Sequence, residues 1–312
     1  MAVEGSLPIL LIPVYRGGRF FEQAFDSIVP CLQWFDRCIV SLNGMETDAD
    51  RVTAHRLGDF CDLQILETHR ILNPVQHLLF IANALTKRLG LDVDAQLFIL
   101  CHDDLLRRSS FEELDEQAWR GFRSDMVGFG DFYTFTNDDP PGLVYQESWF
   151  SRTGRIGPQP RSDFVKTQCA YKRQHDPFTN LSGVRVSVGV FHSTLRYFAL
   201  TGSRTGMRIE YSLIINRRIR SLLNYVPPLV CVRVRYDSAG ALTTRKDFVA
   251  SELRYAIWLW LNTRTVDECR QLFAGDYSPR GVWLLMNVVL LHRYYEFQGS
   301  LKSFLVRIGV LK

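Results

Sequence analysis

The sequence predicts an α/β protein with a mostly parallel central sheet, flanking helices and a helical C-terminal extension. Over residues 7–101, short apolar runs of strand length alternate with segments whose apolar residues recur at helical spacing. Strands separated by helices form parallel sheets with right-handed crossovers. After a final strand at 229–236, the chain shows helical spacing with few Gly or Pro. We therefore expect an α/β domain over 1–225 and a mainly helical extension over 226–312.

The first four strands each end in a polar segment. We expect these strands at 7–14, 38–42, 63–67 and 96–101, with helices between them at 19–32, 49–60 and 74–90. Pro74 suits a first helical turn and Gly90 a helix end. Ligands of parallel sheets bind at the carboxyl ends of the strands. These ends carry Pro13-Val14-Tyr15-Arg16, Ser41-Leu42-Asn43-Gly44, Thr68-His69-Arg70 and His102-Asp103-Asp104.

The middle of the chain is less regular. A capping-box sequence at Ser110 predicts a helix over 110–120, and a strand follows at 126–129. The region 131–184 loses periodicity, and long inserts of this kind are usually functional or mobile. Regular elements are then expected as a strand at 185–190, a helix at 194–200 and a longer helix at 207–222.

The composition is that of an ordinary folded protein. The chain of 312 residues is 46% hydrophobic and 22% charged, which excludes disordered and fibrous classes. A formal net charge of +4, without a recognisable nucleic-acid module, gives no indication of nucleic-acid binding. The 7 cysteines form no CxxC pair and favour buried thiols in a reducing compartment. No leader-like or membrane-spanning stretch is evident, so we expect a cytoplasmic protein.

Asp103 and Asp104 directly follow a buried strand, at the edge where such a sheet binds ligands. Carboxylates there suit a hard divalent cation, Mn²⁺ or Mg²⁺, which needs only one or two protein carboxylates when it also binds a diphosphate. Alternatively, the pair lies in a solvated loop in which Asp104 caps the following turn.

Four segments together resemble the N-terminal half of family 2 glycosyltransferases, of the bacterial polysaccharide type, with the glycosyltransferase-A fold. The segments are PILLIPVYRGGRFFEQAFDSIV, IVSLNG, NPVQHLLFIANALTKRLG and LFILCHDDLL, and the resemblance covers residues 7–225. It implies that the turn Pro13, Val14, Tyr15, Arg16 cradles a nucleoside. Asn43 replaces the usual acidic residue that holds the base or ribose.

The resemblance also implies a metal and diphosphate site at a DXD motif. Its first position aligns with Cys101, so Asp103 is the remaining metal-binding carboxylate, and His102 or Asp104 would compensate for the missing one. His192 is a further candidate metal ligand or acceptor contact, or else a structural histidine.

In the second half of the family, an acidic residue at a helix start acts as general base. Glu210 matches this location, although Tyr211 replaces the usual Asp. An inverting transfer needs one carboxylate to take the proton of the acceptor hydroxyl. Alternatively, Glu210 is a surface residue in a first helical turn. Other carboxylates that could take the role are Asp131, Asp163 and Asp176.

Positive charge beside the diphosphate would stabilise the leaving group. Arg217 and Arg218 are expected two turns beyond Glu210 on the same helix, and Arg204 and Arg208 precede it. His69 and Arg70 at the end of the third strand form a second candidate pair.

The resemblance implies transfer of a hexosyl group from a nucleotide-diphosphate sugar, UDP-linked, to a hydroxyl of a glycan or polyprenyl-linked saccharide. Aromatic residues of the insert would stack on sugar rings or form the core of a lid; they are Phe132, Tyr133, Phe135, Tyr145, Trp149 and Phe150. The C-terminal aromatic residues, such as Trp258 and Trp283, either pack on the catalytic domain or contact the inner face of the plasma membrane.

Two other functions are compatible with the same residues. The sequence Tyr15-Arg16-Gly17-Gly18-Arg19 faintly matches the phosphate loop of a sugar nucleotidyltransferase. The departures at Cys101 and Tyr211 would suit a subunit that binds a glycan or nucleotide sugar without turnover.

Overall fold

The computed structural model describes residues 6–44, 48–136, 142–153, 158–169, 180–204, 208–234, 245–275 and 277–307. Its main sheet has eight strands in the order β3-β2-β1-β4-β10-β6-β11-β9. The first four are β1 (Ile9–Val14), β2 (Cys38–Leu42), β3 (Leu63–Glu67) and β4 (Gln96–Ile99). The others are β6 (Met126–Gly130), β9 (Gln159–Pro160), β10 (Arg185–Ser187) and β11 (Ser221–Tyr225).

The sheet confirms the predicted fold class. Strands β3, β2, β1 and β4 are all parallel, whereas β10 runs antiparallel to both β4 and β6. Alternate residues of β1 enter different cores, with Leu11 on one side of the sheet and Leu10 on the other. This two-sided burial explains why β1 is an unbroken apolar run rather than an alternating one.

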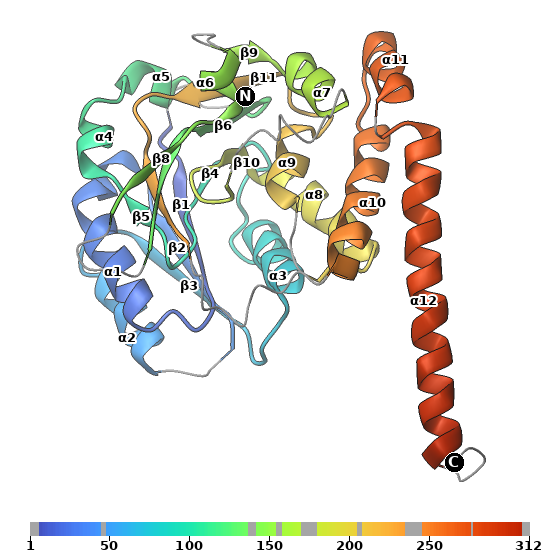
Figure 1. The fold of residues 1–312 in the computed structure, drawn as a ribbon. Helices are drawn as coiled ribbons and strands as arrows, with labels where there is room; N and C mark the ends of the chain where they lie inside the picture. The colour runs from blue at the N-terminus through green and yellow to red at the C-terminus, as the bar shows by residue number, and fades with distance from the viewer. Residues whose placement is uncertain are drawn as a thin grey trace.

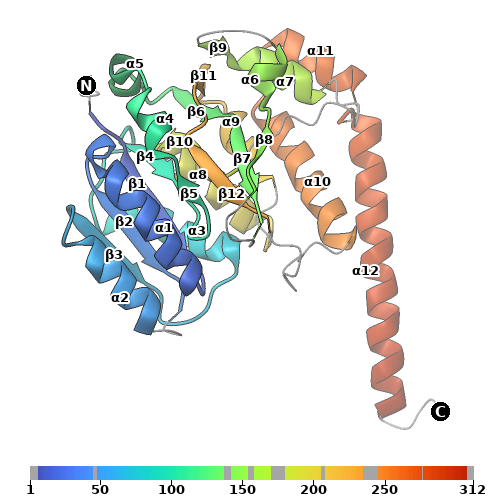
Figure 2. The ribbon, with the colours of Figure 1, turned by 60° about the vertical axis from the view of Figure 1, so that its left-hand side comes forward.

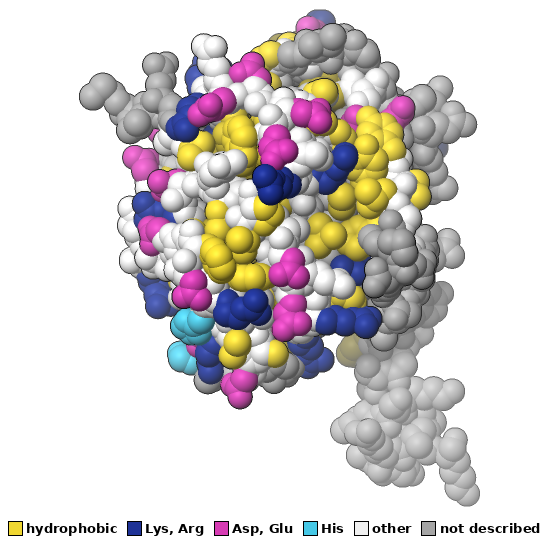
Figure 3. All heavy atoms as spheres, turned by 90° about the vertical axis from the view of Figure 1, so that its left-hand side faces the viewer, with side chains coloured by type: hydrophobic (Ala, Val, Ile, Leu, Met, Phe, Trp, Pro, Cys, Tyr) yellow, Lys and Arg dark blue, Asp and Glu magenta, His cyan; other side chains and the backbone are white. Residues whose placement is uncertain are grey.

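Helices cover both faces of the sheet (Figures 1 and 2). One core contains residues of α1 (Arg19–Ile28), the 3₁₀ segment η1 (Val29–Trp34), α2 (Asp48–Leu57), α4 (Arg108–Glu112) and α5 (Glu116–Arg120). The other contains residues of α3 (Pro74–Lys87), α8 (Val188–Leu200), α9 (Ile209–Ile214) and α10 (Arg245–Leu261). On the face that includes α1 and α2, acidic and basic side chains are interspersed with apolar patches (Figure 3).

A second, four-stranded sheet has the order β5-β12-β7-β8. It consists of β5 (Leu105–Leu106), β7 (Phe132–Phe135), β8 (Val144–Gln146) and β12 (Val230–Arg233). Strand β12 lies beyond residue 226 in the chain, yet it pairs with β5 and β7 from the first half. The purely helical part of the described chain therefore starts at α10. The insert is also more regular than its sequence indicated, since it contains β7, β8, α6 (Trp149–Thr153), β9 and α7 (Arg161–Cys169).

Three predicted elements differ in extent. The helix expected over 110–120 is broken into α4 and α5, because the Asp115 side chain caps α5 by accepting from Gln117 and Ala118 N–H. The strand expected over 185–190 ends at Ser187, whose hydroxyl accepts from Val190 N–H and caps α8. The helix expected over 207–222 was wrong beyond residue 214, because α9 ends there and β11 begins at Ser221.

The C-terminal helices are α10, α11 (Val266–Ala274) and α12 (Pro279–Arg307), and two buried ion pairs connect them to the rest of the chain. Arg208 Nε donates to Glu252 Oε1 of α10 at 2.7 Å, and Arg161 donates to both oxygens of Glu268 of α11 at 3.0 Å. Trp258 of α10 is buried, whereas Trp283 of α12 is 61% exposed. Over the described residues, we find no helix with the length and apolar character needed to span a bilayer.

Candidate active site

Four strand ends lie at one edge of the main sheet, because β3, β2, β1 and β4 are neighbours and parallel. This edge carries the predicted segments 13–18, 41–44, 68–70 and 101–104. Helix α8 starts at the opposite, amino edge of the sheet and runs to the carboxyl edge. Helix α9 follows it in the chain and runs in the reverse direction, so the start of α9 also lies on the carboxyl side. The topology thus brings Glu210 to the same end of the molecule as Asp103.

A buried carboxylate that sequence analysis missed holds the turn after β1. Asp50 of α2 accepts from Gly17 N–H at 3.0 Å and from Gly18 N–H at 2.7 Å. A side chain at Gly17 would not fit, since a Cβ there would lie 2.6 Å from Phe21 Cβ. The fixed turn leaves Tyr15 exposed, with the Arg16 guanidinium 5.5 Å from its ring centre. Asp50 is not distinguishable in the sequence from the other polar residues of its helix.

Asn43 connects β2 to the loop after β3. Its Oδ1 accepts from Leu72 N–H at 2.9 Å and its Nδ2 donates to Leu72 O at 2.8 Å. The side chain is buried, so its amide is engaged with the protein rather than directed at a base. The predicted nucleotide contact of Asn43 is corrected accordingly: the residue holds the loop that presents His69 and Arg70, which are both exposed.

Asp104 is a structural carboxylate. It is 4% exposed, its Oδ1 accepts from Arg233 N–H at 2.8 Å, and its Oδ2 accepts from the Ser182 hydroxyl. Burial and the charge of Asp103 raise its pKa to about 7, against the lowering effect of its hydrogen bonds from Ser182 and Arg233. Both oxygens of Asp104 already accept hydrogen bonds inside the protein, which makes Asp104 the less suitable metal ligand of the two aspartates. Asp103, which is half-buried, remains the candidate ligand.

Arg233 is a second residue that sequence analysis missed. Its guanidinium lies between the rings of Phe20 and Phe135, 4.5 and 4.4 Å from their centres. It donates to Gln23 Oε1 at 2.6 Å and to the backbone oxygen of Asp103 at 3.1 Å. Arg233, at the end of β12, therefore links the backbone of Asp103 to Gln23 of α1. Its signal in the sequence was a charged residue inside the strand-like run 229–236.

His102 lies beside a buried histidine at the start of α3. His77 is 4% exposed and its Nε2 is 2.8 Å from the Ser41 hydroxyl. Burial and then the nearby charge of His102 lower the pKa of His77 to about 4. His77 is therefore neutral at physiological pH, and His102 stands near it at the carboxyl edge.

The charge of Glu210 acts on Cys101, which lies two residues before Asp103. Burial raises the pKa of the Cys101 thiol, and the charges of Asp104, Asp103 and Glu210 raise it further. Glu210 is half-buried in the first turn of α9. Arg208, two residues before Glu210, has a left-handed backbone conformation with φ 66°. An ion pair with Glu252 holds its side chain.

His192 and Arg217, two predicted site residues, lie at the amino edge of the sheet, opposite Asp103. Because β10 is antiparallel to β4, the chain leaves it on the amino side, where Val188 N–H donates to Ala95 O at 2.9 Å. His192 follows on α8 and its Nε2 lies 3.3 Å from Asn83 Oδ1 of α3. It cannot share a metal ion with Asp103, so its predicted metal role was wrong.

Arg217 is placed on the same amino side, just before β11, which is parallel to β6. Its N–H donates to Asn262 Oδ1 at 2.8 Å. The predicted diphosphate contact depended on a continuous helix over 207–222, and the turn after α9 removes that geometry. Arg218 lies near His192, whose pKa is lowered by burial and then by Arg196, Lys87 and Arg218.

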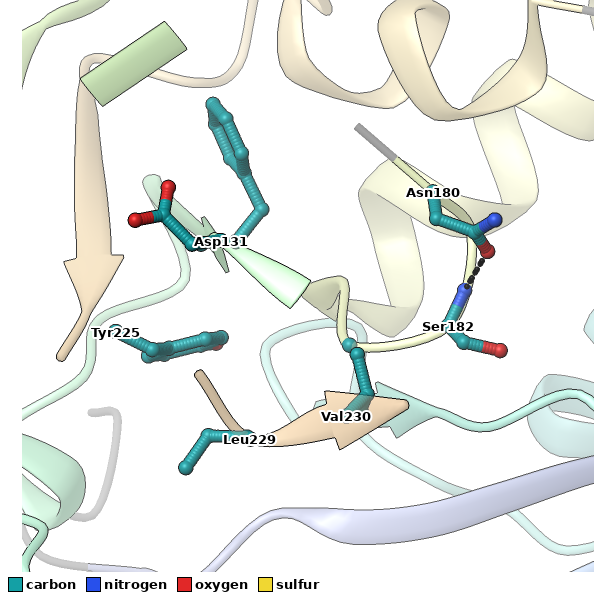
Figure 4. A pocket seen from close by; sticks show the side chains of 9 residues that line it. Asp131, Asn180, Ser182, Tyr225, Leu229 and Val230 are labelled. Carbon is teal, nitrogen blue, oxygen red and sulfur yellow. Dashed lines mark hydrogen bonds between the residues drawn. The ribbon is translucent and has the colours of Figure 1, made fainter. Parts of the chain in front are cut away.

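A pocket opens between the end of β6 and the start of β12 (Figure 4). Asp131 and Tyr225 lie on one side of it, and Ser182, which bonds Asp104, lies on the other. Asn180 Oδ1 accepts from Ser182 N–H at 2.9 Å, the bond drawn in Figure 4. The pocket is therefore connected to the aspartate site through Ser182.

The alternative base candidates are less well placed. Asp131 accepts hydrogen bonds from the hydroxyls of Tyr145 and Ser151 and from Ser148 N–H. Burial alone would raise its pKa, but these bonds outweigh burial and lower it. Asp163 lies on α7, on the amino side, with Lys166 Nζ 3.9 Å away. Asp176 lies outside the described residues.

Most aromatic residues of the insert form core rather than surface. Phe132, Phe135, Trp149 and Phe150 are buried, which favours the lid-core interpretation for these four. Tyr145 is 47% exposed and its ring centre lies 5.6 Å from that of Tyr133.

Neither a protein-family model nor a curated protein matches the chain. Among solved structures it is similar to residues 1–349 of S. aureus TarS, with a TM-score of 0.52 and 9% identity, over 85% of this chain and 69% of that one. The same fragment in complex with UDP-GlcNAc matches with a TM-score of 0.51 and 8% identity, over 89% and 83%. A longer TarS structure matches with a TM-score of 0.50 and 9% identity, over 85% and 41%.

These similarities define the fold. The chain has the mixed α/β architecture of glycosyltransferase-A proteins, as the sequence predicted. At such low identity the likeness extends to the fold alone, and the activity has to be argued from the site.

Proposed function

We propose that this protein is a glycosyltransferase that moves a hexosyl group from a UDP-sugar to an acceptor hydroxyl, with inversion. The observation that carries the proposal is the placement of Asp103 and Glu210 at one end of the sheet, near Cys101, in a glycosyltransferase-A fold. The complexes of TarS with UDP and with UDP-GlcNAc support uracil as the nucleobase and a UDP-sugar as the donor.

In this proposal, Asp103 holds Mn²⁺ or Mg²⁺. The described residues contain no cluster of three or more His, Cys, Asp or Glu side chains suited to a metal. A single carboxylate nevertheless suits a cation whose other ligands are water and diphosphate oxygens. When bound, the metal would neutralise charge on the leaving diphosphate. His102, beside Asp103, is proposed as a further donor contact.

Tyr15 and Arg16 would contact the nucleoside, on the turn that Pro13 and Val14 lead into and that Asp50 fixes. Arg70 is exposed at the same edge and would contact the diphosphate, in place of Arg217.

Glu210 would act as the base. It would take the proton of the acceptor hydroxyl as that oxygen bonds to the anomeric carbon. The bond from this carbon to the diphosphate oxygen breaks, and the nucleoside diphosphate leaves with the electron pair.

The acceptor and the location complete the proposal. We infer a glycan or polyprenyl-linked saccharide as acceptor, in bacterial polysaccharide biosynthesis on the cytoplasmic side of the membrane. Membrane contact through the C-terminal helices is the alternative to the pairing of α12 described below, and the vesicle measurement there distinguishes the two.

The test is calorimetric titration of the protein with UDP and with GDP, each with and without Mn²⁺. We expect binding of UDP that needs the metal and is lost in Asp103→Asn. The matched control is His192→Gln, at the opposite edge, which should bind UDP as the wild type does. Absence of binding to either nucleotide would overturn the proposal. Binding of UDP without turnover of any UDP-sugar would instead indicate a binding subunit.

A further inference from the structure

Helix α12 carries a stripe of large, exposed apolar side chains, which we call the α12 stripe. It consists of Trp283, Met286, Leu290, Tyr294 and Phe297, which are 61%, 45%, 59%, 54% and 66% exposed. Successive members are three, four, four and three positions apart. This spacing averages 3.5 residues, which places them along one face of the helix in the manner of a coiled-coil seam.

The stripe is separate from the face by which α12 contacts the rest of the molecule. Val282 and Leu285 pack against the core that includes α10. Trp283 and Met286 each follow one of these residues by one position, a rotation of about 100° around the helix. Beyond its contact with α10, α12 extends past the body of the protein in both views (Figures 1 and 2).

We propose that the α12 stripe pairs with the same stripe of a second copy of this chain. A large apolar side chain exposes about 200 Å² when fully accessible. At the observed exposures, two stripes would bury on the order of 1,100 Å² together, which reaches the ~1,000 Å² needed for a specific interface.

The sequence along the stripe allows a second copy to pair with it. The segment 281–292, which carries Trp283, Met286 and Leu290, contains no Lys, Arg, Asp or Glu. Two copies of this segment meet without repulsion between like charges. The 3.5-residue spacing of the stripe suits a single partner helix.

The experiment is sedimentation equilibrium of the full chain across the micromolar range. We expect a dimer, and Leu290→Glu and Phe297→Glu should each weaken dimerisation by at least tenfold. The matched control is Leu284→Glu, which is 52% exposed on the same helix but turned about 120° from Leu290. It should leave the dimer intact. Circular dichroism would verify that each variant is folded.

Three results would overturn the proposal. The first is a wild type that is monomeric at every concentration. The second is a Leu284→Glu variant whose dimer is weakened as much as that of Leu290→Glu. The third is a monomer that sediments with vesicles of phosphatidylcholine and phosphatidylglycerol, which would assign the stripe to a membrane surface.

Discussion

The backbone N–H of Arg233 donates to Asp104 Oδ1 at 2.8 Å, and thereby joins β12 to the turn that carries Asp103. The two aspartates are adjacent in sequence but have different surroundings. Asp104 is turned into the protein, towards Ser182 and Arg233, whereas Asp103 is half-buried at the edge of the sheet. Substitutions at the two positions should therefore have different effects.

We expect Asp104→Ala to destabilise the fold. The change leaves the Arg233 N–H and the Ser182 hydroxyl without this buried acceptor, which costs about 1–3 kcal/mol for each such group. Urea unfolding followed by circular dichroism measures the loss. Asp103→Ala, the matched comparison, should lower the free energy of unfolding by less than Asp104→Ala does, because Asp103 is half-buried whereas Asp104 is 4% exposed. Equal destabilisation by the two variants would contradict the assignment of Asp104 as the structural carboxylate.

His77 should make stability depend on pH. Its pKa is lowered from 6.5 to about 4 in the folded protein, because the neutral ring is buried beside Ser41. A lowered folded-state pKa gives a stabilising contribution that is complete above pH 6.5 and is lost as the pH falls towards 4. The full loss corresponds to about 3 kcal/mol.

The measurement is urea unfolding at a series of pH values between these limits, for the wild type and for His77→Gln. Glutamine keeps a polar side chain but does not titrate, so the slope over this window should become shallower. His55→Gln, in the exposed part of α2, is the control. An unchanged slope in His77→Gln would refute the prediction.

Asp50 should affect nucleotide binding without contacting the nucleotide. Asp50→Ala removes the acceptor for the Gly17 and Gly18 N–H groups, so the turn that presents Tyr15 and Arg16 loosens. We expect affinity for UDP to fall about tenfold, the effect of about 1.4 kcal/mol. Asp48→Ala, at the fully exposed start of the same helix, should leave the affinity unchanged. Calorimetry of both variants distinguishes these outcomes.

The sheet was predictable because local patterns determine it. Strands β1 to β4 are short apolar runs bounded by turn residues, and their parallel pairing follows from the helices between them. The error after α9 has a local cause as well. The segment 215–220 between α9 and β11 contains no Gly or Pro that would predict a break. Asn216 stabilises the turn there, by accepting from Arg218 N–H and donating to Thr194.

The site was less predictable because its contacts are distant in sequence. Asp104 meets Ser182 and Arg233 at separations of 78 and 129 residues, and Asn43 meets Leu72 at 29. A polar residue at a strand end looks the same whether it faces a ligand or a distant segment. The predictions for His192 and Arg217 failed for a topological reason. Because β10 is antiparallel to β4, the chain leaves β10 at the amino edge of the sheet, so His192 lies there and not at the carboxyl edge.

Glu210 supplies the sharpest test of the proposed chemistry. If its carboxylate takes the proton of the acceptor hydroxyl, Glu210→Gln should lower kcat by about 10²–10⁴ and leave the KM for the UDP-sugar nearly unchanged. The amide has a similar shape but cannot accept the proton, so donor binding is kept while transfer is lost. Asp163→Asn, on the amino side of the sheet, should retain wild-type kinetics and serves as the control. A fall in donor affinity with unchanged kcat would instead show that Glu210 helps to bind the donor, and the role of base would have to be sought elsewhere on the carboxyl side.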